Sequence, residues 1–236
     1  MRIVYLLEDT TISAAARVTM AQADALVARG HRVRIVTKGL PVTWRGSQAE
    51  WIYVDDFREF VADADERVAD PSVLAHWIVD DEVYRTGTPR EHDPPRVLLG
   101  DAEGYGAVAH ARWFHQKLDL IRVSPFVPSR DEPLDSVQEF HVALTAPEMT
   151  RLLHSCDVLV APAPGLLAAE AMAAGVVCVS PPRAETSAVD LGEQLIEILS
   201  DAALRERLRA QGRETAEQWR SKRVVKTLEA FFRSPE

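Results

Sequence analysis

Apolar and polar positions follow two alternating periods in the first part of the chain. Residues 2–7 (RIVYLL) form a short apolar run that ends at Glu8, a pattern typical of a buried parallel strand. Residues 13–29 then carry small apolar side chains at helical spacing, and Gly30 follows where a left-handed cap would end the helix. Residues 31–38 return to a strand pattern. This segment predicts one βαβ unit with a right-handed crossover.

A second series of strands and helices begins near residue 96. Short apolar runs predict strands, and longer segments with helical spacing predict helices. The expected strands span 51–54, 96–100, 118–124, 137–143, 157–163 and 176–180, and the expected helices span 106–117, 147–154 and 166–174. We interpret residues 56–92, which are charged and punctuated by prolines, as an irregular joint between domains. The alternation predicts an α/β fold with two parallel sheets, followed from residue 187 by a helical segment.

The composition allows a sizeable core and restricts the partners. The chain has 236 residues, of which 47% are hydrophobic, enough for one large domain or two small ones. The net charge is -9, and the lysines and arginines do not form a block. We therefore expect no nucleic-acid or anionic-membrane surface, because phosphate backbones are bound by a concentrated cationic face. A small anionic ligand needs only a local site and stays compatible with this composition.

The cysteines and the start of the chain predict neither a metal site nor a targeting segment. Cys156 and Cys178 lie in apolar runs, which indicates two buried free thiols, and no paired Cys/His spacing suits zinc. The first residues turn acidic at once and lack the cleavage site of a signal peptide. No apolar run reaches the length of a membrane-spanning helix. We expect a soluble, cytoplasmic protein without a transmembrane segment, a metal or a cofactor.

Residues 151–179 (RLLHSCDVLVAPAPGLLAAEAMAAGVVCV) resemble the signature of the group 1, retaining nucleotide-sugar glycosyltransferases. In that family a short helix precedes an S-x-D-V-h-V-x-P-S strand, where h is apolar, then an E-G-F-G-L-P-x-x-E-A-M-A loop and helix, and a G-h-P-V-V strand. Weaker matches to the same family are at 12–37, 80–85, 94–100 and 217–232. The resemblance implies a GT-B fold, in which two Rossmann-like domains face each other across a cleft and the second binds most of the nucleotide-sugar.

The resemblance also implies how the chain is divided into domains. Residues 1–75 would form a strongly shortened N-terminal Rossmann-like domain, and residues 76–216 the C-terminal domain of the nucleotide-sugar-binding type. Residues 217–236 would form a helix that crosses back to the N-terminal domain.

The loop before residue 166 predicts a phosphate site. Backbone N–H groups at a helix start point toward a bound phosphate, and the helix dipole favours its negative charge. A glycine at position 165 lets such a ligand approach closely. The resemblance implies that Glu170 binds the nucleotide ribose, and a solvated helix position is the alternative. We expect the substrate to be bound by Gly100, Gly165, Leu166 and Glu170.

The sequence departs from the family where the donor is held. Pro162 stands where the family has the glutamate that holds the transferring sugar, and Asp101 stands where it has the arginine that neutralises the diphosphate. Tyr105 occupies the position nearest to the family's lysine. Losing one charge-assisted hydrogen bond costs about 1.5–3 kcal/mol, and electrostatic stabilisation is usually the largest catalytic contribution. We therefore expect a degraded donor site in a weakly active or non-catalytic glycosyltransferase-like protein.

Two other functions stay open. In the first, the chain is an active small glycosyltransferase, with Arg17, Lys38 or an arginine from a second subunit replacing the lost cations. In the second, it is a non-enzymatic interaction scaffold, with a protein partner or as a homo-oligomer, because a shortened N-terminal domain leaves apolar surface to be covered. His76, the only histidine near the family's sugar-contacting position, is interpreted as a joint residue.

Overall fold

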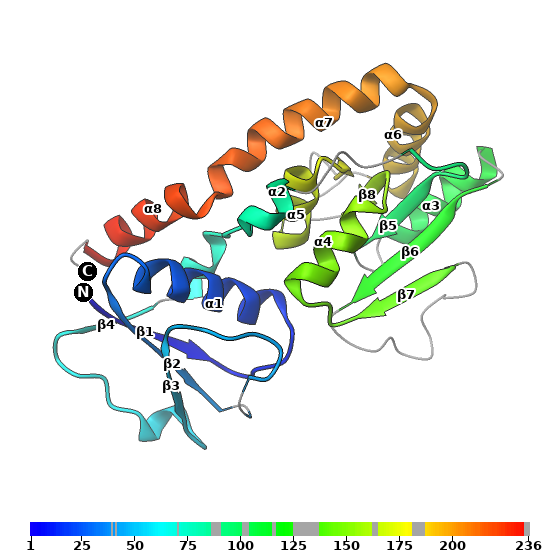
Figure 1. Cartoon of the computed structure of the whole chain (residues 1–236). Helices are drawn as coiled ribbons and strands as arrows, with labels where there is room; N and C mark the ends of the chain where they lie inside the picture. Colours follow the sequence, from blue (N-terminus) through cyan, green and yellow to red (C-terminus); the bar gives the residue numbers. More distant parts are fainter. Residues whose placement is uncertain are drawn as a thin grey trace. The chain divides into compact units, whose positions relative to one another are not determined.

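The structure is a computed structural model that describes residues 1–38, 40, 42–69, 71–85, 91–100, 104–114, 117–124, 137–161, 165–180 and 187–233. The chain divides into two compact units (Figure 1). Unit 1 comprises Met1–Asp80 and Gln218–Glu236, and unit 2 comprises Asp81–Glu217. Among the described residues, unit 1 has a parallel sheet of four strands and unit 2 one of five. The predicted α/β fold with two parallel sheets is confirmed.

Unit 1 begins with the βαβ unit that the sequence predicts. Its elements are β1 (Arg2–Leu7), α1 (Ala14–Val27), β2 (Arg32–Thr37), β3 (Glu50–Tyr53), the 3₁₀ turn η1 (Phe57–Glu59), β4 (Glu66–Val68), the 3₁₀ turn η2 (Pro71–Ala75) and the C-terminal helix α8 (Ser221–Arg233). The strand order is β3-β2-β1-β4, with every pair parallel. The hydroxyl of Ser13 caps α1 by accepting from the N–H of Ala16 at 3.1 Å. Gly30 follows the helix with φ 83°, the left-handed conformation expected of it.

The core of unit 1 lies between one face of its sheet and the helices α1 and α8. Ile3 and Tyr5 of β1 and Ile35 of β2 lie on this face, and they pack with Leu26 of α1 and Phe232 of α8. The rings of Tyr5 and Phe232 meet edge to face, with centroids 6.2 Å apart. The C-terminal helix is therefore part of the core of the N-terminal unit.

Strand β4 lies in the segment 56–92, which is predicted from the sequence to be irregular, and that prediction is wrong for residues 66–68 and for the short helix at residues 81–85. β4 pairs with β1 at the edge of the sheet. Glu66 is buried there and forms ion pairs with Arg34 of β2 and Arg2 of β1. Three residues, two of them charged, show no strand period. The charge of Glu66 is accommodated because Arg2 on the adjacent β1 and Arg34 on β2, one strand further, pair with it.

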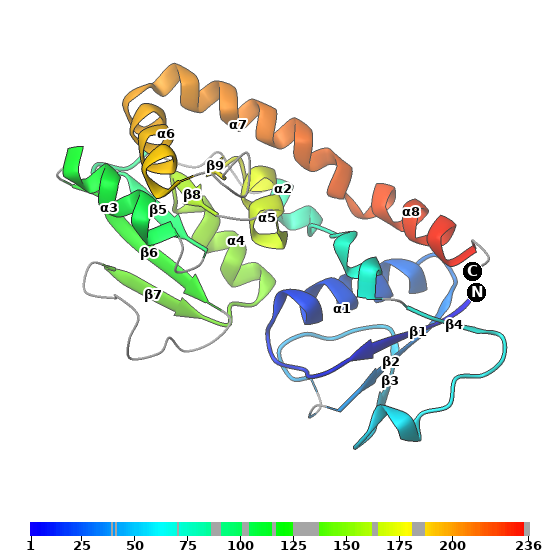
Figure 2. The same cartoon turned by 180° about the vertical axis from the view of Figure 1, so that it is seen from behind.

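Unit 2 alternates strands and helices as predicted. Its elements are α2 (Asp81–Arg85), β5 (Arg96–Leu99), α3 (Gly104–Phe114), β6 (Asp119–Ser124), β7 (Glu139–Val142), α4 (Ala146–His154), β8 (Val158–Val160), α5 (Leu166–Ala174), β9 (Val177–Val179), α6 (Ala188–Ser200) and α7 (Ala202–Ala216), which leads into the 3₁₀ turn η3 (Glu217–Trp219). The strand order is β7-β6-β5-β8-β9, parallel throughout. Helices α3 and α6 cover one face of this sheet (Figure 2), and α4 and α5 cover the other.

Helices α3 and α6 approach each other closely because two glycines lie at their contact. A Cβ on Gly192 of α6 would lie 2.7 Å from Cβ of His110, and one on Gly106 of α3 would lie 2.7 Å from Cβ of Ala188. Both distances are well inside van der Waals contact, so any side chain at these positions would push the helices apart.

Within the described ranges, the structure has no helix that is long and apolar enough to cross a membrane.

Candidate functional site

The order of strands in unit 2 reverses between β5 and β8. From β5 the chain continues through β6 to β7 on one side, and it then returns to place β8 and β9 on the other. In open parallel sheets, ligands bind in the crevice beyond the carboxyl ends of the two strands at such a reversal. Gly100 directly follows β5, and Gly165 precedes α5 after β8. Gly100 and Gly165, two of the site residues predicted from the sequence, therefore lie at the position where a parallel sheet binds ligands.

Gly100 brings the end of β5 close to the start of α5. Its N–H donates to the carbonyl of Val160, the last residue of β8, at 3.3 Å. A Cβ on Gly100 would lie 3.0 Å from Cδ2 of Leu167, in the first turn of α5. A larger residue at position 100 would require the side chain of Leu167 to shift. Gly100 thus lies where the end of β5, the end of β8 and the start of α5 meet.

The start of α5 has no side-chain cap among the described residues. Gly165 is the N-cap, with φ −170° and ψ −179°, and it is followed by the buried Leu166. This extended conformation suits any residue, so the glycine is not required by the backbone. No described atom lies within 4 Å of the place that its Cβ would occupy. The N–H groups of the first helical turn, which have no partner within the helix, and the lack of described atoms beside the Gly165 Cβ position suit an anionic ligand.

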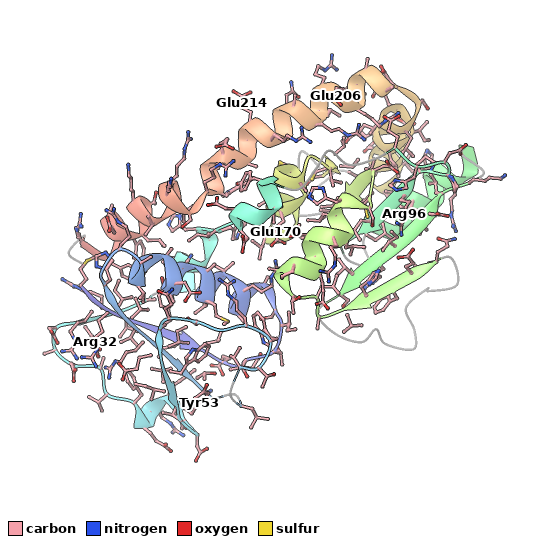
Figure 3. The ribbon with its side chains drawn as sticks, in the orientation of Figure 1. Arg32, Tyr53, Arg96, Glu170, Glu206 and Glu214 are labelled. Atoms are coloured by element: carbon pink, nitrogen blue, oxygen red, sulfur yellow. The ribbon has the colours of Figure 1, made fainter. Side chains whose placement is uncertain are left out.

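Glu170 lies on α5 within unit 2 (Figure 3) and is only 3% exposed. A solvated helix position is therefore excluded. The rest of the helix is rich in alanine, and the residues around Glu170 in sequence, Ala168, Ala169 and Ala171, are buried as well. A carboxylate in such surroundings is costly unless it forms hydrogen bonds or ion pairs. Burial at this position favours a specific role for Glu170 over a general contribution to solubility.

Arg122 is a buried cation near the same end of the sheet, and it is not among the site residues predicted from the sequence. It lies on β6, directly beside Leu99, the last residue of β5, in the parallel register. Its side chain shares the α3 face with Leu99 and Leu120 and is 4% exposed. A charged residue inside the apolar run LDLIRVS was the available signal. The site thus has a permanent positive charge on the strand next to β5.

The substitutions that motivate the degraded-site hypothesis fall outside what the structure describes. Asp101 and Pro162 belong to undescribed segments, and the side chain of Tyr105 is likewise undescribed. The alternative cations Arg17 and Lys38 belong to unit 1. There, Nζ of Lys38 lies 2.8 Å from the carboxylate of Glu8 and 4.5 Å from the ring centre of Phe57.

Asp157, the acid of the signature strand, has a structural role at the opposite end of the sheet. Its carboxylate accepts from the backbone N–H of Arg96 at 2.8 Å and lies 3.1 Å from Nδ1 of His92. It therefore ties the start of β8 to the start of β5. This tie keeps the two strands in register, and their far ends then carry the candidate site.

The cysteines take no part in the site. Cys156 and Cys178 are free, as predicted, and burial raises the pKa of each thiol to about 12. Thiolates are the reactive form, so neither residue is a nucleophile at neutral pH. Among the described residues, no group of His, Cys, Asp or Glu side chains is arranged to hold a metal ion.

Comparisons with known proteins give the fold a class. No protein-family model and no curated protein matches the chain. Among solved structures, WaaG, a glycosyltransferase involved in lipopolysaccharide biosynthesis, is 14% identical with a TM-score of 0.66, over 99% of this chain and 100% of that one. An α-glucosyltransferase in complex with UDP and a mismatched DNA 13-mer is 12% identical with a TM-score of 0.67, over 99% of both chains. An O-GlcNAc transferase mutant from Thermobaculum terrenum is 10% identical with a TM-score of 0.64, over 99% of this chain and 67% of that one.

These similarities, together with the two parallel sheets, show that the chain has a GT-B-like fold of two Rossmann-type units. At such low identities the likeness establishes the fold and nothing further, because one fold carries many functions.

Proposed function

We propose that this chain is a glycosyltransferase-like protein that binds a nucleoside diphosphate or nucleotide-sugar beyond β5 and β8, and that transfers sugar weakly or not at all. The observation that carries the proposal is the meeting of Gly100 with the uncapped start of α5 at the strand reversal. The diphosphate would lie against the first N–H groups of α5, beside Gly165. The similar α-glucosyltransferase structure contains UDP, which supports a nucleotide of this kind.

The buried Glu170 would accept hydrogen bonds from the ribose hydroxyls. The family resemblance of its surrounding motif supports this role, and so does its low exposure. A neutral amide in its place keeps the shape of the side chain and removes the charge. Losing a charge-assisted hydrogen bond of this kind weakens binding by roughly tenfold to a hundredfold.

Weak transfer follows from the residues that stand in place of the family's donor-holding groups. Pro162 has neither a carboxylate nor an N–H to offer the transferring sugar, and at the position of the family's arginine Asp101 would bring a negative charge toward the diphosphate. The leaving diphosphate gains charge in the transition state, so a repulsive carboxylate raises the barrier more than it weakens ground-state binding.

Calorimetric titration with UDP, GDP and ADP tests the binding, and release of nucleotide from the corresponding glucose donors tests transfer. We expect one of these nucleotides to bind, Glu170→Gln to weaken it by roughly tenfold or more, and transfer to stay near the uncatalysed rate. The exposed Glu193 on α6 offers a matched control, and Glu193→Gln should bind like the wild type. If none of these nucleotides binds, the proposed site is wrong. If the chain transfers sugar efficiently, the proposed impairment of catalysis is wrong.

Arg122 favours a second candidate, an active small glycosyltransferase. Its buried charge lies on the strand beside β5, where a cation could offset Asp101 and the missing family arginine. Under this alternative, the wild type shows clear nucleotide release. Arg122→Gln then lowers turnover strongly while it lowers the melting temperature only slightly. The turnover measurement above separates the two candidates.

A further inference from the structure

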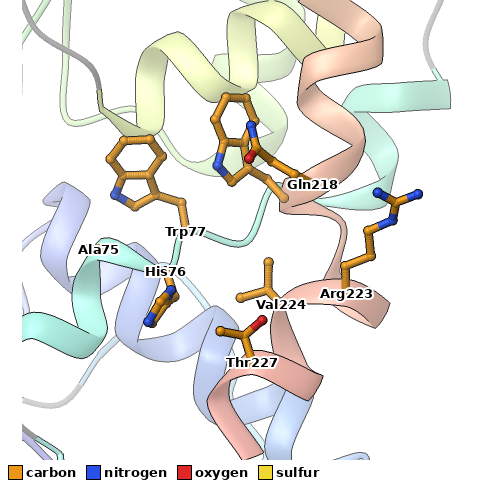
Figure 4. Close-up of a pocket in the computed structure, with 8 residues that line it drawn as sticks. Ala75, His76, Trp77, Gln218, Arg223, Val224 and Thr227 are labelled. Atoms are coloured by element: carbon orange, nitrogen blue, oxygen red, sulfur yellow. The ribbon is translucent and has the colours of Figure 1, made fainter. Parts of the chain in front are cut away.

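Unit 1 contains a pocket that the proposed function does not use. It has a volume of about 340 Å³, within the size range of small-ligand sites. We name it the tryptophan pocket, and it is lined by Ala75, His76, Trp77, Gln218, Trp219, Arg223, Val224 and Thr227. One wall comes from the chain after η2, and the other comes from the end of η3 and the first turns of α8 (Figure 4).

The backbone around this pocket is held by contacts within unit 1. The buried Gln22 of α1 donates from Nε2 to the carbonyls of Val73 and His76, at 2.9 and 2.7 Å. The N–H of Val79 donates to the carbonyl of Trp219 at 3.1 Å, which joins the two walls. A pocket whose walls are already fixed loses little entropy when a ligand enters.

Aromatic faces form one part of the lining. The indole rings of Trp77 and Trp219 are 5.9 Å apart between centroids and are inclined at 46°. Both are partly exposed, so part of each aromatic face is accessible to a ligand. Tilted rings of this kind offer a flat ligand an offset or edge contact.

Cationic and neutral polar groups form the other part. Arg223, Gln218 and Thr227 are exposed, and Figure 4 shows Arg223 and Thr227 on the α8 side of the pocket and His76 and Trp77 on the other. No carboxylate among the described residues forms an ion pair with Arg223. None of the described lining residues is acidic, in a chain whose net charge is -9. The described lining thus presents one permanent positive charge and no carboxylate to a ligand.

We propose that the tryptophan pocket binds a small anion that carries one flat aromatic ring. The ring would lie against the indoles of Trp77 and Trp219, and the anionic group would accept hydrogen bonds from Arg223 and Thr227. A cationic ligand would be repelled by Arg223, and a purely apolar one would leave the guanidinium without a partner on that side. All the lining residues belong to unit 1, so the proposal does not depend on nucleotide binding by unit 2.

Phenyl phosphate is a suitable probe, because it joins a single ring to a phosphate. Calorimetry and tryptophan fluorescence would be measured on the full chain without nucleotide. We expect phenyl phosphate to bind with one site per chain, and phenol and inorganic phosphate each to bind at least roughly tenfold more weakly, since each lacks one of the two contacts. Equal binding of phenyl phosphate and inorganic phosphate would overturn the aromatic part of the proposal.

Arg223→Gln should weaken the binding of phenyl phosphate by roughly tenfold or more, because it removes a charge-assisted hydrogen bond. Arg223 is exposed, so its replacement should leave the fold intact. Lys226, also exposed on α8 and outside the pocket lining, gives the matched control. Lys226→Gln removes the same charge and should change the affinity by less than about twofold. Equal weakening in both variants would show that net charge alone attracts the anion and would overturn the site.

The chain has five tryptophans, so the fluorescence response must be assigned. In the double variant Trp77→Phe, Trp219→Phe each position keeps an aromatic face, and we expect calorimetric binding to persist while the fluorescence response disappears. A full fluorescence response in the double variant would place the ligand beside another tryptophan.

Discussion

The carboxylate of Glu229 on α8 lies 3.0 Å from Nε2 of His31, the residue before β2. The same carboxylate accepts from Nε of Arg29 at 3.2 Å, and its side chain is 8% exposed. One carboxyl group therefore ties the C-terminal helix to the turn between α1 and β2. This contact and the ring contact of Tyr5 with Phe232 both fasten α8 to unit 1.

This tie makes the stability of unit 1 sensitive to acid. Hydrogen bonds from Arg29 and His31 lower the pKa of Glu229 to about 2, from an ordinary value of 4.5. Because the folded-state pKa is the lower one, the contribution of Glu229 is complete above the ordinary value and is lost as the pH falls toward the folded one. We expect Glu229→Gln to unfold more easily than the wild type at neutral pH, with the gap narrowing below pH 4.5. Urea unfolding across this pH range measures the difference in stability between the variant and the wild type. A difference that does not change with pH would contradict the coupling between ionisation of Glu229 and folding.

The hydroxyl of Tyr5 is buried and has no hydrogen-bond partner among the described residues. Burial also raises the pKa of this phenol. Removing an unsatisfied buried hydroxyl relieves its desolvation cost, so we expect Tyr5→Phe to stabilise the protein by about 1–2 kcal/mol. Tyr84 is the matched control, because its hydroxyl donates to the carbonyl of Ala216 at 2.5 Å. Tyr84→Phe should destabilise by about 1 kcal/mol, and chemical denaturation of both variants would reveal the opposite signs.

The contact between α3 and α6 should be intolerant of side chains. A methyl group at Gly192 would lie 2.7 Å from Cβ of His110, so Gly192→Ala must move one helix against the other. Overpacking of this kind costs about 1–3 kcal/mol. At Gly46 the added Cβ would have no described atom within 4 Å, so Gly46→Ala should change stability by less than about 0.5 kcal/mol. Thermal unfolding compares the two, and equal effects would contradict the close approach.

The charge at position 101 should limit nucleotide binding. Asp101→Arg replaces a repulsive carboxylate with a cation that pairs with phosphate. We expect this variant to bind UDP, or whichever nucleotide the wild type binds, roughly tenfold or more tightly than the wild type does. Glu193→Arg makes the same change in charge at an exposed position on α6 and should have little effect. Calorimetry at two salt concentrations distinguishes a local contact from general attraction. An unchanged affinity in Asp101→Arg would indicate that another cation, such as Arg122, already neutralises the phosphate.

The amino-acid sequence by itself determined most of the elements and both parallel sheets. Buried parallel strands are short continuous apolar runs and the helices between them have their own period, so both can be identified within a few residues. Residues 2–7 and 166–174 were predicted with their observed bounds. The glycines and the signature motif likewise predicted where a ligand would meet unit 2.

The tertiary structure alone decided how charged residues were accommodated. The buried carboxylate of Glu66 pairs with Arg2 on the adjacent β1 and with Arg34 on β2, one strand further, and no local pattern indicates that pairing. The burial of Glu170 and Arg122 depends in the same way on what packs over them. The tryptophan pocket joins residues 75–77 to residues 218–227, which are distant in the sequence. Periodicity describes which face of an element is buried, but only the folded chain determines which distant group each face meets.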